Sequence, residues 1–152
     1  DIQSNHSSDI VVYSNVDTLD EWRIFIKITG QSSFENKWLN CFMHLPSMYP
    51  YVPPSFTFLT IPFHPNISCH GNVMFNLLDK DYNPELSISS LIEEIVKILR
   101  NPEEDSAINR EAYKMFIDDR NAFIEKQRRS EIGKSDYKEF IEGVKIFDQV
   151  LD

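Results

Sequence analysis

The sequence predicts an α+β domain: a four-stranded antiparallel meander sheet packed against a central helix, with further helices towards the C-terminus. In the first part of the chain, apolar residues alternate with polar ones at a period of two, which is typical of half-buried strands. From residue 88 onwards, apolar residues recur at the spacing of an amphipathic helix. Chains that place strands first and helices afterwards pack the helices on one face or end of the sheet.

Four segments have the pattern expected of strands: residues 10–13, 22–28, 38–45 and 56–60. The clearest is 22–28, Trp-Arg-Ile-Phe-Ile-Lys-Ile, in which one face is apolar and the other is mixed. Residues 29–33, Thr-Gly-Gln-Ser-Ser, have the composition of a hairpin turn. Because consecutive strands are joined by hairpin-length links, we predict that they follow one another in the sheet as a meander.

Three helices of the domain are predicted after the sheet, and a fourth helix is predicted in the C-terminal extension. The central helix spans residues 88–99 and is apolar at nearly every turn, so it is expected to lie against the sheet. Ser90 and Glu93 have the spacing of a capping box at its start. The second and third helices are predicted at about 107–118 and 121–129.

The chain is expected to divide into three parts. Residues 1–9 are predicted to be a flexible N-terminal segment, residues 10–130 the domain, and residues 131–152 a C-terminal extension helix. The last helix has one apolar face, formed by Tyr137, Phe140, Ile141, Val144, Phe147 and Leu151. Two interpretations of this face stay open: it covers the domain's own surface, or it presents Tyr137, Phe140 and Phe147 to a partner protein.

Composition excludes several classes of protein. With 11 Phe, 6 Tyr, 2 Trp and only 4 Gly among 152 residues, the chain is expected to fold around a core. A net charge of −9 argues against nucleic acid as the main partner, and no apolar run has the length of a membrane span. Its two cysteines do not form a disulfide framework, which favours a reducing intracellular compartment, cytoplasmic or nuclear. Cys41, inside a predicted strand, is expected to be buried.

Residues 61–76 are predicted to be an ordered bend, because two prolines, an asparagine and a glycine lie between two apolar runs. Within it, His64-Pro65-Asn66 presents an imidazole and a primary amide on a backbone that Pro65 stiffens. Such an amide stabilises an oxyanion only where a nucleophile lies nearby.

The bend strongly resembles the active-site segment of ubiquitin-conjugating enzymes, which reads H-P-N-I-x-x-x-x-G-x-I-C-L. Without gaps, Gly71 falls on the family glycine, Val73 on the isoleucine and Met74 on the catalytic cysteine. A thioether has no proton to lose and cannot carry a thioester. The resemblance therefore implies a fold-preserving, catalytically inactive variant of the family, and the chain is expected not to be an enzyme.

Further matches in chain order extend the resemblance over about residues 10–129. They include Trp22-Arg23-Ile24-Phe25-Ile26, His44-Leu45-Pro46, Tyr49-Pro50-Tyr51-Val52-Pro53-Pro54, Tyr82-Asn83-Pro84, and Asn101-Pro102 with Ala112-Tyr113 and Asp119-Arg120. The chain also departs from the family pattern. No counterpart of the family's first helix precedes Ile10, Glu85 stands where a small residue is usual, and Ser106 replaces an acidic residue, with Asp105 adjacent.

The resemblance implies a binding partner, adaptor or scaffold of the ubiquitin pathway that uses no cofactor. The expected partners are proteins: ubiquitin, an active conjugating enzyme, a RING-type ligase or a larger complex. Tyr51, Asn83 and Pro84 are candidate contact residues, because the family presents an aromatic residue to RING-type ligases at the Tyr51 position. The alternative to a ubiquitin-pathway protein is a structural subunit of a larger assembly that has no role in that pathway.

Two site residues have competing interpretations. His64 and Asn66 are expected to brace the bend rather than to act in catalysis, since buried loop carbonyls need hydrogen-bond donors. Met74 either fills the space of the missing thiol or offers a soft contact to a partner peptide.

Cys69 is the alternative nucleophile, because it lies in the same bend and next to His70. A transferase working through Cys69 would need the active loop to be rebuilt, since the family position is five residues away. His44, His64, Cys69 and His70 have none of the usual ligand spacings, so no metal site is expected.

Overall fold

The computed structural model describes residues 5–7, 10–16, 20–28 and 38–129. The predicted C-terminal extension helix, with Tyr137, Phe140 and Phe147, lies outside these residues, as does the predicted turn at 29–33. No helix in the described part of the chain is long and apolar enough to cross a membrane.

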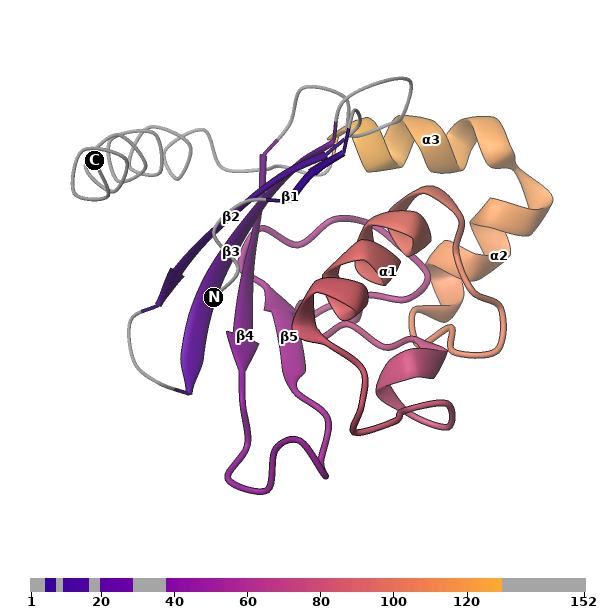
Figure 1. Ribbon diagram of the computed structural model, residues 1–152. Helices are drawn as coiled ribbons and strands as arrows, with labels where there is room; N and C mark the ends of the chain where they lie inside the picture. Colours follow the sequence, from indigo (N-terminus) through magenta and orange to yellow (C-terminus); the bar gives the residue numbers. More distant parts are fainter. Residues whose placement is uncertain (1–4, 8–9, 17–19, 29–37, 130–152) are drawn as a thin grey trace.

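The strands form one antiparallel sheet in the order β1-β2-β3-β4-β5 (Figure 1). Their bounds are β1 Asn5–Ser7, β2 Ile10–Val16, β3 Glu21–Ile28, β4 Trp38–His44 and β5 Ser55–Phe58. The four predicted strands correspond to β2–β5, so the predicted α+β class and the meander are confirmed. The sheet has one strand more than predicted.

The additional strand, β1, comes from the segment that the sequence analysis assigned to a flexible N-terminus. It pairs with β2 through a short link, with Ser7 opposite Ile10 and Asn5 opposite Val12. The alternation of apolar residues could not reveal it, because Asn-His-Ser is wholly polar and backbone hydrogen bonds alone define the pairing. The domain limits at residues 10 and 130 stay predictions.

Within the described residues, three α-helices and one short 3₁₀ helix follow the sheet. They are η1 Asn76–Leu78, α1 Ile88–Arg100, α2 Arg110–Asp118 and α3 Arg120–Arg129. The predicted capping box at Ser90 and Glu93 is wrong. The N-cap of α1 is Ser87, whose hydroxyl oxygen accepts a hydrogen bond from the Ser90 amide at 3.1 Å. Helix α2 begins three residues later than predicted, where the Asn109 side chain accepts from the Ala112 amide at 3.1 Å.

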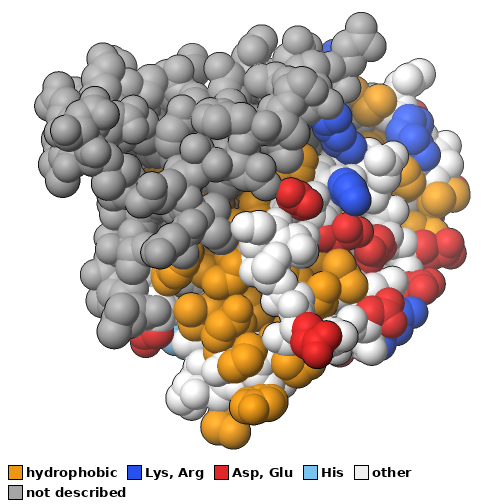
Figure 2. All heavy atoms as spheres, viewed as in Figure 1, with side chains coloured by type: hydrophobic (Ala, Val, Ile, Leu, Met, Phe, Trp, Pro, Cys, Tyr) orange, Lys and Arg blue, Asp and Glu red, His pale blue; other side chains and the backbone are white. Residues whose placement is uncertain are grey.

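The link between β4 and β5 exposes apolar side chains. Tyr51 is 76% exposed, and Met48 and Val52 are also exposed. Figure 2 shows hydrophobic side chains protruding at the lower edge of the molecule, where Figure 1 places this link. Exposed apolar residues gathered in one loop are typical of a surface that contacts another protein.

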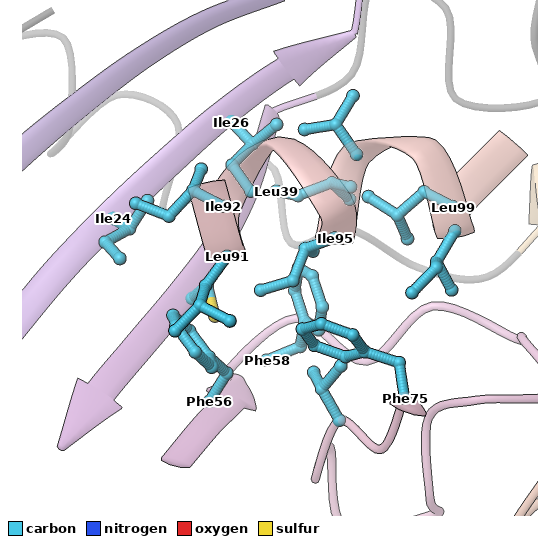
Figure 3. Close-up of a cluster of buried hydrophobic side chains, with 14 of the residues drawn as sticks. Ile24, Ile26, Leu39, Phe56, Phe58, Phe75, Leu91, Ile92, Ile95 and Leu99 are labelled. Atoms are coloured by element: carbon cyan, nitrogen blue, oxygen red, sulfur yellow. The ribbon is translucent and has the colours of Figure 1, made fainter. Parts of the chain in front are cut away.

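The core lies between α1 and one face of the sheet (Figure 3). Its largest buried members are Ile24, Ile26, Leu39, Met43, Phe56, Phe58, Ile67, Phe75, Leu91 and Ile95. Cys41 is also fully buried there, as predicted, and burial raises the pKa of its thiol to about 12. Phe75 belongs to the end of the bend, so the core holds this end of the candidate site in place.

The second half of the bend is attached to β5 by backbone hydrogen bonds. The Phe58 amide donates to the Gly71 carbonyl at 2.8 Å, and the Val73 amide donates to the Phe56 carbonyl at 3.0 Å. Gly71 has a φ of +89°, and a Cβ atom at this position would lie 2.2 Å from the Phe58 carbonyl oxygen. Only glycine fits this close approach without a backbone shift.

Replacing Gly71 by alanine is therefore expected to lower the free energy of unfolding by about 1–3 kcal/mol, from backbone strain and the clash with Phe58. Urea denaturation followed by circular dichroism measures this loss. Asn72→Ala is the matched control, because its side chain is exposed and its loss should cost much less. Equal stability of Gly71→Ala and the wild type would contradict the close approach.

Candidate functional site

The bend carries the residues that the sequence analysis selected, and the structure buries two of them completely. His64 and Asn66 have 0% exposure, whereas Cys69 and His70 are exposed and Met74 is partly buried. The predicted residues therefore lie at two levels. One set forms the base of the bend, and the other lies on its surface.

His64 joins the bend to α1. Its Nδ1 accepts a hydrogen bond from the Asn66 amide at 3.0 Å, so the ring proton is on Nε2, which donates to the Ile98 carbonyl at 2.7 Å. Burial lowers the pKa of His64 to about 4, and the hydrogen bond to Ile98 opposes this shift without cancelling it. The imidazole is therefore neutral at pH 7 and links two segments of the chain.

The Asn66 side chain pairs with the main chain of Glu103. Asn66 Nδ2 donates to the Glu103 carbonyl, and the Glu103 amide donates to Asn66 Oδ1, both at 2.9 Å. The side-chain amide thus donates to and accepts from the same main-chain residue, as two paired residues of adjacent antiparallel strands do. Since the group is buried and hydrogen bonded on both sides, it joins the bend to the link between α1 and α2.

The link between α1 and α2 closes over the bend through four further hydrogen bonds. The Pro65 carbonyl accepts hydrogen bonds from the Ile108 and Asn109 amides, both at 3.0 Å. The Glu103 carboxylate accepts from the Asn76 amide at 2.8 Å, and the Ser106 hydroxyl donates to the Asn76 side chain. Ser106, which replaces the family's acidic residue, is thus used to hold the bend.

Glu103 is the residue at this site that the sequence analysis missed. It uses its amide, its carbonyl and its carboxylate on two positions of the bend, Asn66 and Asn76. No local pattern identifies it, because these contacts span 37 and 27 residues of sequence. Its neighbour Asp105 forms an exposed ion pair with Lys80 at 3.0 Å, which contributes little to stability.

Met74 is held by its backbone, since its amide donates to the Asn66 carbonyl at 2.9 Å. The side chain is partly buried and ends in a thioether. This position is compatible with either prediction for Met74, filling the space of the missing thiol or offering a soft contact to a partner peptide.

Cys69 and His70 occupy the tip of the bend, in a turn organised by Ser68. The Ser68 hydroxyl oxygen accepts from the His70 amide at 3.2 Å and from the Asn72 amide at 3.1 Å. Within the described residues, no hydrogen bond joins the Cys69 thiol to His70, and Asn66 is bonded to Glu103 instead. The structure therefore does not bring these three groups together as a catalytic set.

The four residues considered for a metal site are also distributed between the two levels. Both ring nitrogens of His64 are already hydrogen bonded below the surface, while Cys69 and His70 lie outside. Over the described ranges, no group of three or more histidine, cysteine, aspartate or glutamate side chains is placed to hold an ion.

The partner-binding candidates Tyr51, Asn83 and Pro84 are all exposed. The Tyr82 hydroxyl donates to the Pro50 carbonyl and so ties the loop of Tyr51 to the loop of Asn83 and Pro84. Burial raises the pKa of Tyr82 further above neutral pH, where a tyrosine hydroxyl is already protonated and able to donate. The two loops together present one exposed surface.

His64 is expected to make stability depend on pH. The unfolded chain takes up this proton near pH 6.5 and the folded chain only near pH 4, so stability falls as pH decreases between these values. The shift corresponds to about 3 kcal/mol. Chemical denaturation at pH 7 and at pH 4.5 should show that His64→Gln differs less from the wild type at the lower pH. For Asn72→Ala, an exposed control that removes no titratable group, the difference should stay constant; the same constancy in His64→Gln would contradict the assignment.

Comparison with known proteins identifies relatives of one kind. The family model described as "Ubiquitin-conjugating enzyme" matches residues 1–131. A "Probable ubiquitin-conjugating enzyme E2 31" from Arabidopsis thaliana is 29% identical over 114 residues, which cover 75% of this chain and 74% of the relative. "NEDD8-conjugating enzyme Ubc12" from Dictyostelium discoideum is 34% identical over 88 residues, 58% of this chain and 38% of the relative. The human "Ubiquitin-conjugating enzyme E2 U" is 28% identical, with 81% of this chain and 39% of the relative covered.

These findings correct one prediction. The sequence analysis expected that the chain is not an enzyme; this is wrong, because the relatives are named as conjugating enzymes and the matching model is that of an enzyme family. The predicted fold family is confirmed by the same match. On the strength of a family model that covers residues 1–131, the chain belongs to the ubiquitin-conjugating enzyme family.

Proposed function

We propose that this domain acts in the ubiquitin pathway by binding proteins, as a partner of an active conjugating enzyme, an adaptor or a scaffold. The observation that carries the proposal is the bend, which keeps His64 and Asn66 as braces while Met74 stands at the position of the family's cysteine. A thioether at this position forms no thioester.

The surface best suited to a protein partner combines Tyr51 with Asn83 and Pro84. Tyr51 is largely exposed, and the Tyr82–Pro50 hydrogen bond fixes its loop against the second one. A preorganised apolar surface with an aromatic centre is typical of interaction hot spots. We also propose a reducing compartment, cytoplasm or nucleus, because both cysteines are free thiols.

Binding is tested by NMR titration of the labelled domain with ubiquitin, with an active conjugating enzyme and with a RING-type ligase domain. We expect shifts of the Tyr51 and Asn83 signals with at least one of them. Tyr51→Ala should weaken that binding about tenfold, since truncating a central aromatic residue costs more than 1 kcal/mol. Ile117→Ala on α2 is the control, because Ile117 is 59% exposed and lies outside this surface. The absence of shifts with all three proteins would reject the proposal.

A transferase that uses Cys69 is the second candidate, and one observation favours it. Of the two cysteines in the chain, Cys41 is buried and Cys69 is exposed in the bend itself. The bonded state of Asn66 argues against it, because this amide is not available to an intermediate at Cys69.

A thioester gel separates the two candidates. The domain is mixed with ubiquitin, activating enzyme and ATP, beside a conjugating enzyme that loads. The Cys69 candidate predicts an adduct that is sensitive to reductant, lost in Cys69→Ala and retained in Met74→Ala. No adduct on the wild type, while the reference enzyme loads, would reject Cys69 as the nucleophile and leave the binding proposal in place.

A further inference from the structure

The link between β4 and β5 lies within a segment that carries no formal charge. Residues 38–78 contain no Asp, Glu, Lys or Arg, although 26% of the chain is charged. Within this segment, Met48 is 61% exposed, Tyr51 is 76% exposed and Val52 is 43% exposed. A protein that binds to the link therefore finds apolar side chains and neutral polar groups, and no ion pair can form there.

Met48 organises the link through its backbone. Its carbonyl accepts a hydrogen bond from the Tyr51 amide at 2.8 Å and another from the Val52 amide at 3.1 Å. These two bonds close a single turn that carries all three exposed side chains. Met48 thus belongs to the same turn as Tyr51, the aromatic residue of the proposed contact surface.

The four methionines of the chain, all within the described residues, differ in exposure. Met43 is fully buried, and Met74 and Met115 are partly buried. Met48 is the one whose side chain is mostly exposed. Oxidation of a thioether by a peroxide requires that the oxidant reach the sulfur, so Met48 is expected to react first.

We propose that Met48 is a site of reversible oxidation that regulates binding at the surface of Tyr51, Asn83 and Pro84. The oxidant is hydrogen peroxide: a sulfur–oxygen bond forms, the oxygen–oxygen bond breaks, and the peroxide is reduced to water while the sulfur loses two electrons. A thiol-dependent sulfoxide reductase reverses the step, releasing the oxygen as water and oxidising two thiols to a disulfide. This inference rests on the proposed function, whose surface it regulates.

The sulfoxide changes the chemistry of the link more than its shape. A flexible apolar side chain becomes polar, and its new oxygen must be desolvated when a partner covers it. Because residues 38–78 contain no Lys or Arg, this segment offers no cation to pair with that oxygen. We therefore expect oxidation of Met48 to weaken binding about tenfold.

Peroxide treatment of the full chain tests the first step. All measurements use a Cys69→Ser background, which removes the exposed thiol; Cys41 is buried and stays protonated, so it does not compete. Peptide mass spectrometry should show that Met48 is oxidised about tenfold faster than any other methionine. Equal rates at Met48 and at the partly buried Met74 and Met115 would overturn the proposal.

The binding titration, repeated before and after peroxide treatment with the protein that shifts the Tyr51 signal, tests the second step. Met48→Leu keeps an apolar side chain of similar size without an oxidisable sulfur, so it should bind normally and resist peroxide. Met115→Leu is the matched control and should stay sensitive. Peroxide sensitivity that persists in Met48→Leu, or unchanged binding by a domain oxidised at Met48, would overturn the proposal.

Retention on a phenyl column examines the same surface without a protein partner. The domain oxidised at Met48 should elute earlier than the untreated domain, whereas peroxide should leave the elution of Met48→Leu unchanged. Failure of the untreated domain to bind all three proteins would reject the proposed function. The column then decides separately whether oxidation alters this surface, and equal retention of the oxidised and untreated domains would overturn the inference.

Discussion

The two-way pairing of the Asn66 side chain with the main chain of Glu103 is the interaction on which the candidate site depends. It holds the link between α1 and α2 against the bend, and the contacts of Pro65 and Asn76 extend the same closure. Because the amide is buried, loss of one partner would leave the other unsatisfied at a cost of about 1–3 kcal/mol. The bend is therefore shaped by Glu103, which follows Asn66 by 37 residues and Asn76 by 27.

Much of the fold could be predicted because its signals are local. Alternation identified β3, helical spacing identified α1, and the His-Pro-Asn motif with Gly71 identified the family before any contact was known. The sequence also separated the buried thiol of Cys41 from Cys69, since a cysteine within an apolar strand usually packs in the core. These inferences needed no knowledge of which segments meet in space.

What could not be predicted depends on contacts between distant residues or on the backbone alone. Glu103 has no distinguishing neighbours in sequence, and β1 is a polar segment that only its pairing with β2 reveals. The cap of α1 was assigned to the wrong serine because Ser87 and Ser90 both precede apolar residues, and only the hydrogen bond decides between them. The prediction that the chain is not an enzyme was wrong for another reason. It rested on the single position Met74, whereas the match to the enzyme family covers residues 1–131.

The hydrogen bond from Tyr82 to Pro50 lowers the conformational entropy that the two loops would lose when a partner protein binds. Two separate loops would each lose conformational freedom when a partner docks, and that loss would be subtracted from the affinity. Since the hydroxyl already joins them, most of this ordering takes place during folding and not during association. Removing the hydroxyl would therefore leave every contacting side chain unchanged and still shorten the lifetime of a complex.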